Sequence, residues 1–105
     1  MLKLLFTGDF APLQVPENID NDHFNSLELL LKDSDLHITN LECPLTKSDL
    51  AIGKTGPAIK GHPGAIELLK QAKVGLACLA NNHIFDFGEK GIVDTIDHCR
   101  QNGID

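Results

Sequence analysis

Polar side chains able to bind metals and transfer protons end or follow three apolar runs of this chain, at residues 2–7, 36–41 and 74–79. Carboxylate and amide oxygens with an imidazole suit divalent cations such as Mn, Fe, Zn or Mg. Two such ions about 3.5–4 Å apart would clamp a phosphoryl group and activate a water for in-line attack. A neighbouring histidine could protonate the leaving oxygen or hold the phosphate. The candidate side chains are Asp9, Asn40, Glu42, Asn81, Asn82 and His83.

The elements that must position these side chains alternate along the chain. The three apolar runs are expected to be buried strands, and residues 23–32, 63–72 and 88–101 carry apolar side chains at helical spacing. This β-α-β-α-β-α order predicts a layered α/β fold with a mostly parallel sheet. The carboxyl ends of parallel strands share one edge, where ligands bind in open α/β sheets. We therefore expect the candidate side chains to converge at that edge.

Cap signals mark the ends of two predicted helices. Asn102 and Gly103 end the third helix, so residues 104–105 are expected to enter a fourth strand. An unpaired strand edge recruits other strands, which predicts a possible homo-oligomer through the exposed edge of the sheet. Side chains able to cap the first helix stand at Asp20, Asn21 and Asp22.

A long segment without periodicity, residues 44–62, separates the second strand from the second helix. Such a loop inside a small domain is often functional. Lys54, Lys60 and His62 lie on it and could contact an anionic substrate. Solvated lysines and an ordinary loop histidine are the alternative interpretation, and the sequence leaves both open.

Composition excludes several classes of function. The chain has 105 residues and a net charge of −6, with no basic patch of the kind that nucleic-acid binding requires. No stretch approaches the length of a signal peptide core or a membrane span, so we expect a cytoplasmic protein without a membrane segment. The cysteines have no paired spacing, which argues against a disulfide framework. Cys78 and Cys99 are expected to be buried fillers. Cys43 could approach a metal beside Glu42, although a Cys-Pro pair at a strand exit is more often plain structure.

The ordered motifs resemble a known family. A first strand ends in Gly8-Asp9, a second ends in Asn-Leu-Glu-x-Pro at 40–44, and Pro63 opens a helix. The longest block runs Leu-Ala-Asn-Asn-His-x-x-Asp-x-Gly-x-x-Gly from 79 to 91. Together they are similar to the CapA family of capsule biosynthesis, which is linked to poly-γ-glutamate and is similar in fold to the calcineurin-like metallophosphoesterases.

The resemblance implies a role for each matching residue. Asp9 would be a terminal ligand of one metal, and Glu42 would take the bridging position, assisted by Asn40. Asn82 would ligate a second metal. His83 would be the general acid or the phosphate-binding group. The implied activity is a metal-dependent phosphoesterase acting on an anionic phosphoester or a polyglutamate-type substrate.

Neighbouring residues would support this site. Asn81 would lie next to the ligands, and Asp86 would orient the loop or cap the following helix. His62 and Lys60 are further candidates for contacts with substrate, with ordinary loop residues as the more common alternative. The family domain is longer and adds histidine motifs in its second half, so residues 1–105 are expected to be the N-terminal part of such a domain. Residues 59–63 also depart from the family, because relatives more often place an aromatic and basic pair there.

Other interpretations remain open from the sequence alone. Each candidate taken singly is explained by ordinary structure, such as a turn at Asp9 or a backbone bond from His83. Taken together, three polar strand exits in family order favour a site. A non-catalytic module that binds polyanions or assembles capsule would keep the same fold. A truncated, inactive fragment is the third interpretation.

Overall fold

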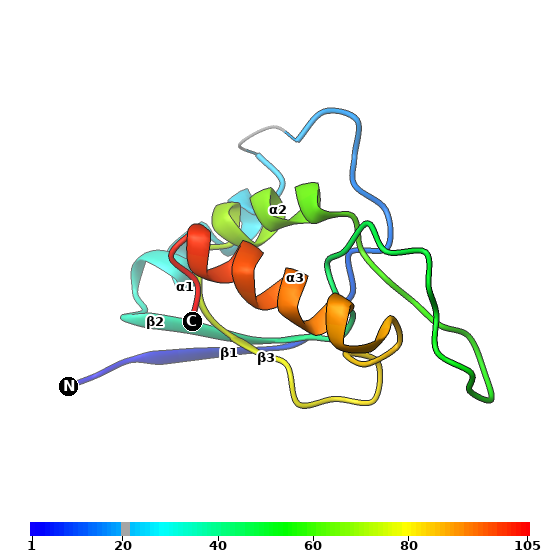
Figure 1. Cartoon of the computed structure of the whole chain (residues 1–105). Helices are drawn as coiled ribbons and strands as arrows, with labels where there is room; N and C mark the ends of the chain where they lie inside the picture. Colours follow the sequence, from blue (N-terminus) through cyan, green and yellow to red (C-terminus); the bar gives the residue numbers. More distant parts are fainter. Residues whose placement is uncertain (20–21) are drawn as a thin grey trace.

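Three parallel strands form a single sheet in the order β1-β2-β3. A computed structural model describes residues 1–19 and 22–105 of the chain. The strands are β1 (Leu4–Phe10), β2 (Leu36–Leu41) and β3 (Val74–Cys78). Helical segments lie between and after them, so the predicted alternating α/β fold with a parallel sheet is confirmed (Figure 1).

The helices all lie on one side of the sheet (Figure 1). They are α1 (Glu28–Lys32), α2 (Ile66–Gln71) and α3 (Gly88–Gln101), and 3₁₀ turns precede the first two at Asn25–Leu27 and Pro63–Ala65. The third helix has the bounds that its spacing predicts, and the first is shorter than the expected 23–32. Asp20 and Asn21, expected as caps, lie outside the described residues. No helix in the described part of the chain is long and apolar enough to cross a membrane.

Strand β2 shows why the sheet packs as it does. Its side chains alternate, with His37, Thr39 and Leu41 buried and the other three half-buried. Because successive side chains of a strand point to opposite faces, the buried set faces the helices. The buried apolar cluster on that side consists of Leu41, Leu45, Ala65, Ile66, Leu69, Ala72, Val74, Ala77, Cys99 and Ile104.

His37 is a buried polar residue that the sheet and the second helical segment satisfy together. Its Nδ1 lies 2.7 Å from the carbonyl oxygen of Ala72, and its Nε2 lies 2.8 Å from the hydroxyl of Thr7. Both ring nitrogens therefore have partners, as buried polar groups require. This histidine ties β1 to the end of α2.

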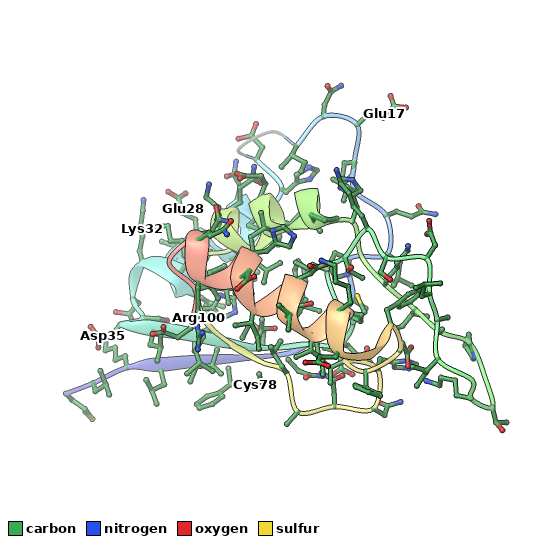
Figure 2. The ribbon with its side chains drawn as sticks, in the orientation of Figure 1. Glu17, Glu28, Lys32, Asp35, Cys78 and Arg100 are labelled. Carbon is green, nitrogen blue, oxygen red and sulfur yellow. The ribbon has the colours of Figure 1, made fainter. Side chains whose placement is uncertain are left out.

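The opposite face of the sheet is open in the described structure, and here the expectation of buried strands was wrong. Phe6 is 67% exposed and Leu4 is 44% exposed. Cys78, expected to be buried, is exposed, and Figure 2 shows it on the side of the sheet without helices. An apolar run predicts a strand that can be buried on both faces, but it does not reveal whether a second layer covers it. Self-association through a sheet edge stays a prediction.

The last residues of the chain begin a further strand beside β3. The amide of Ala77 donates to the carbonyl oxygen of Asp105 at 2.7 Å. The amide of Asp105 in turn donates to the carbonyl oxygen of Gly75 at 3.0 Å. This pair of bonds is the parallel-ladder pattern, with Asp105 opposite Leu76. These two bonds agree with the expected entry into a fourth strand, although residues 104–105 are not themselves assigned as a strand.

The long loop returns to the fold through Gly61. Gly61 bridges to Leu45, and its amide donates to the carbonyl oxygen of Pro44 at 2.9 Å. A Cβ placed on Gly61 would lie 2.8 Å from Leu45 Cδ2 and 2.9 Å from the backbone oxygen of Pro12. Position 61 therefore has no room for any side chain.

We expect Gly61→Ala to destabilise the fold by about 1–3 kcal/mol, because overpacking forces backbone to move. Chemical denaturation monitored by circular dichroism would measure the change. Gly53→Ala is the matched control, since nothing lies within 4 Å of a Cβ there. Equal stability of the two variants would contradict the packing argument.

Candidate functional site

A hydrogen-bonded chain of side chains runs along the carboxyl edge of the sheet. The register places Asp9 opposite Asn40, after an irregularity in β1. The Asn40 amide donates to Asp9 Oδ1 at 2.8 Å, and the Asn81 amide donates to Asn40 Oδ1 at 3.0 Å. Residues from β1, from β2 and from the loop after β3 thus meet at one edge. This is the edge at which open α/β sheets bind ligands.

Asn81 also shapes the loop that follows β3. Its Oδ1 accepts from the amides of His83 and Ile84 at 3.1 and 3.0 Å. Its Nδ2 donates to the carbonyl oxygen of Leu41 at 2.9 Å. Asparagine side chains commonly hold tight turns in this way. Asn81 therefore fixes the position from which His83 leaves the loop.

His83 is held through one ring nitrogen. Its Nδ1 lies 2.7 Å from Oδ2 of Asp86, whose side chain is 1% exposed. A carboxylate on one imidazole nitrogen fixes the ring orientation and the tautomer, so that Nε2 is left for a ligand. Among residues 1–19 and 22–105, His83 Nε2 has no hydrogen-bond partner.

Asp86 gathers three donors around one buried carboxylate. Lys54 Nζ lies 2.5 Å from Oδ1, and the Ile59 amide donates to Oδ2 at 2.8 Å. Burial raises the pKa of Asp86, but the bonds from Lys54, Ile59 and His83 outweigh it and hold the pKa at about 2. The Asp86 carbonyl oxygen also accepts from the Ile52 amide at 2.9 Å. Asp86 makes no capping bond to α3 and instead joins the long loop to His83.

Glu42 and Asn82 lie at the same edge with unoccupied oxygens. Asn82 is exposed and Glu42 is half-buried. The Glu42 amide donates to the Phe10 carbonyl oxygen at 3.0 Å, which anchors the residue beyond the end of β1. In the described part of the chain, neither side chain has a hydrogen-bond partner. Both side chains are therefore available to a ligand.

Lys60 and His62, named from the sequence as possible substrate contacts, bond to neighbouring loop residues. Lys60 Nζ lies 2.5 Å from the carbonyl oxygen of Ser48 and 2.7 Å from Asp49 Oδ1, and it stands 4.9 Å from the centre of the Phe87 ring. His62 Nδ1 accepts from the Gly64 amide at 3.0 Å and caps the turn before α2. Both residues shape the loop in this structure.

Cys43 is fully buried beside this edge. Burial, together with the charge of Glu42, raises the pKa of its thiol to about 11. Metal ligation and nucleophilic attack use the thiolate, which this environment disfavours. In this structure the thiol packs in the interior beside the edge, as a structural Cys-Pro at a strand exit would.

The described residues contain no group of three or more His, Cys, Asp or Glu side chains placed to hold a metal ion. The donors at the edge are instead mixed, with the Asp9 carboxylate accompanied by asparagine amides. Amide oxygens are ligands for hard divalent cations but are weaker than carboxylates. The edge therefore offers only part of a metal shell.

A comparison of the sequence with known families shows which family the chain belongs to. The family described as "Bacterial capsule synthesis protein PGA_cap" matches residues 3–105. The chain belongs to this family. The resemblance drawn from the strand-end motifs is confirmed, and the parallel sheet with interleaved helices agrees with the N-terminal part of a calcineurin-like fold.

Two relatives share part of the sequence of this PGA_cap chain. Both are named "Probable polyglutamine synthesis accessory protein" and come from two strains of Mycobacterium tuberculosis. Each is 32% identical over 63 residues, which is 60% of this chain and 17% of the relative. The matched segment is therefore a small part of each relative's length.

Two features at the carboxyl edge of the sheet in this PGA_cap chain have no clear signal in the sequence. Lys54 and the Ile59 amide reach Asp86 across 27 or more positions of the chain. The only local signal is a lysine in a long loop, which does not name its partner. The sequence also does not show that Asn81, and not the adjacent Asn82, joins the hydrogen-bonded chain.

Proposed function

We propose that this chain contributes the N-terminal half of a metal-dependent phosphoesterase site. The observation that carries the proposal is the continuous network from Asp9 through Asn40 to Asn81, which reaches His83 at the sheet edge. Oxygen donors and a carboxylate-oriented imidazole at one rim are the parts that hydrolysis of a phosphoester uses. Residues 1–105 would form the N-terminal part of the complete domain.

The donors suit a divalent cation in type but fall short in number. Asp9 uses only Oδ1 toward Asn40, so Oδ2 is left for an ion. Glu42 and Asn82 offer further oxygens without breaking a described bond. Three or four oxygens leave the shell open, so further ligands must come from outside this set. Mn, Fe, Zn or Mg, and two ions in a complete domain, agree with this chemistry.

The residues of the chain would divide the work. Asp86 holds Nδ1 of His83 and so directs Nε2 outward, where it can hold a phosphate oxygen or deliver a proton to the leaving oxygen. Asn81 fixes the backbone on which His83 stands. A bound divalent cation would stabilise the negative charge that develops on the phosphoryl oxygens. Together these groups would lower the barrier to cleavage.

The setting of the activity would be capsule or polyglutamate synthesis. The family description refers to bacterial capsule synthesis, and the two relatives are named for polyglutamine synthesis. Both connect the chain to the synthesis of a polymer, and the motif resemblance to a family linked to poly-γ-glutamate favours an acidic one. An anionic phosphoester or a polyglutamate-type compound is therefore the proposed substrate class.

Asp9→Ala tests the metal part of the proposal. We expect the purified protein to bind Mn²⁺ and to hydrolyse an aryl phosphate, and the variant to lose at least tenfold in Mn²⁺ affinity. Isothermal titration measures the affinity separately from turnover. Asp35→Ala is the control, because that carboxylate bonds the Lys3 amide far from the edge. Unchanged Mn²⁺ affinity in Asp9→Ala would contradict the site.

A non-catalytic polyanion-binding module is the second candidate. The lack of a carboxylate, histidine or cysteine cluster among the described residues favours it. Metal content separates the two functions. Stoichiometric metal that is lost in Asp9→Ala supports the enzyme, whereas polymer binding by metal-free protein supports the module.

A further inference from the structure

Backbone contacts close the base of the long loop between β2 and α2. Gly61 bridges to Leu45, and its carbonyl oxygen accepts from the Thr46 amide at 3.1 Å. A compact surface loop whose ends lie side by side in this way is an Ω-loop, a type that is frequently functional. The position of the part between these ends (green in Figure 1) is set by contacts of its own.

Three of these contacts meet on Asp86. The Ile52 amide donates to its carbonyl oxygen at 2.9 Å. The Lys54 ammonium group lies 2.5 Å from Oδ1, and the Ile59 amide donates to Oδ2 at 2.8 Å. Gly56 has a φ of +88°, which lets the chain turn back between the last two donors. Asp86 is therefore the point at which the long loop meets the loop that carries His83.

The same carboxylate orients His83. Its Oδ2 lies 2.7 Å from Nδ1 of the imidazole ring. The two oxygens of a carboxylate lie in one plane, so an ammonium group that fixes Oδ1 also fixes the direction in which Oδ2 points. The Lys54 side chain is 21% exposed and that of Asp86 is 1% exposed, so water competes little for this pair. We propose that Lys54 is a positioning residue for His83, which acts through the Asp86 carboxylate and not by contact with substrate.

The other lysine in this part of the loop has a different place. Lys60 pairs with Asp49, whose side chain is 94% exposed. Lys54 thus reaches the buried carboxylate, whereas Lys60 reaches a carboxylate at the surface. The inference rests on the role proposed for His83 in phosphoester cleavage, and it adds the group that fixes the histidine ring.

Loss of the ammonium group should release the ring. Without Lys54 the buried Oδ1 of Asp86 has no charged donor, and leaving a buried acceptor unpaired is costly, so the carboxylate is expected to rotate. His83 Nδ1 then has no fixed acceptor. Because the hydrogen bond at one ring nitrogen sets which nitrogen carries the proton, the freed ring should populate both tautomers.

Lys54→Met tests this expectation. The ¹⁵N shifts of the His83 ring, recorded at a pH at which the ring is neutral, report the tautomer without any need for activity. We expect a single tautomer with the proton on Nδ1 in the parent protein and a mixture in the variant. With an aryl phosphate and Mn²⁺, kcat should fall about 10–100-fold, the usual cost of losing an orienting partner. KM should stay nearly unchanged.

Lys47→Met is the matched control. Lys47 lies on the same loop and carries the same charge, but it is exposed and lines a separate groove with Pro63 and His98. Its ring signature, kcat and KM should match those of the parent protein. Lys54→Gln serves if Lys54→Met does not fold. Glutamine keeps an N–H donor without the charge, so the same changes are expected at a smaller size.

The outcomes separate this inference from the proposed function. A single Nδ1–H tautomer in a folded Lys54 variant would overturn the inference, and so would an equal change of the ring signature in Lys47→Met. A raised KM with unchanged kcat would mean that Lys54 contacts substrate, which also overturns it. A parent protein without phosphatase activity, whose His83 ring nevertheless changes tautomer in Lys54→Met, would contradict the proposed function and support the positioning of the ring by Lys54.

Discussion

His83→Ala is expected to lower the turnover of an aryl phosphate by about 10²–10⁴-fold, the usual contribution of a positioned proton donor. Asp86 occupies Nδ1 of this ring at 2.7 Å, so the only nitrogen that can reach a substrate is Nε2. Removing the imidazole takes away that group and leaves the oxygen donors of Asp9 and Asn40 in place. Steady-state kinetics with added Mn²⁺ would measure the loss.

Two measurements separate chemistry from folding in this variant. Mn²⁺ affinity should stay close to that of the parent protein, since His83 is only a neighbour of the proposed ligands. The thermal unfolding midpoint should fall less than in Asp86→Ala, because Asp86 loses one donor and keeps Lys54 and the Ile59 amide. His23→Ala is the matched control, because His23 is exposed and lies outside the strand edge. Turnover that persists in His83→Ala would rule out this histidine as proton donor or phosphate-binding group.

Asp86→Ala is expected to have the largest effect on stability, a loss of about 3–5 kcal/mol in the free energy of unfolding. The carboxylate is 1% exposed and bonded to Lys54, Ile59 and His83. Its removal leaves an ammonium group and an amide without their acceptor. The total free energy of unfolding of a small domain is only about 5–15 kcal/mol. A loss of this size would therefore loosen the loop and the site together. Urea denaturation would measure the loss.

The acid dependence of stability gives an independent check on the same carboxylate. The Asp86 pKa in the folded state is about 2, against an ordinary value of 3.8. A lowered folded pKa means that the carboxylate stabilises the fold fully above pH 3.8 and progressively less as the pH falls toward 2. Asp86→Asn should flatten this part of the curve.

A control carboxylate lies on the long loop, the segment that Asp86 holds through Lys54 and Ile59. Asp49 also pairs with a lysine, Lys60, but its side chain is 94% exposed. Exposed pairs contribute little, so Asp49→Ala should leave the free energy of unfolding close to that of the parent protein. If Asp49→Ala and Asp86→Ala destabilise the protein equally, the buried carboxylate is not the anchor of the loop.

Local patterns in the sequence were enough to predict the elements and their order. The spacing of α3 depends on residues close together in the sequence, and the predicted bounds of this helix were confirmed. The convergence of Asp9, Asn40 and Asn81 follows from topology, because parallel strands end at one edge. Strand patterns and connection rules therefore carry the fold and the location of the candidate site.

Long-range partners were beyond the sequence. Lys54 is 32 positions from Asp86, and nothing in the loop composition distinguishes it from Lys60. The burial of β1 was also predicted wrongly, since Phe6 has the same apolar character whether or not a layer covers it. Which of two adjacent asparagines turns inward depends on the backbone path of the loop, which only coordinates reveal.

The all-parallel sheet has a consequence for the order of folding. Leu4 pairs with Leu36 and Ile38 pairs with Leu76, so each contact must close a connection of more than 30 residues. Such pairings are slow to form because loop entropy is lost before contacts are gained. During biosynthesis the first two strands can meet while the third is still being made. We therefore expect the contact between Asn40 and Asn81, which needs β3 in place, to form after β1 and β2 have paired.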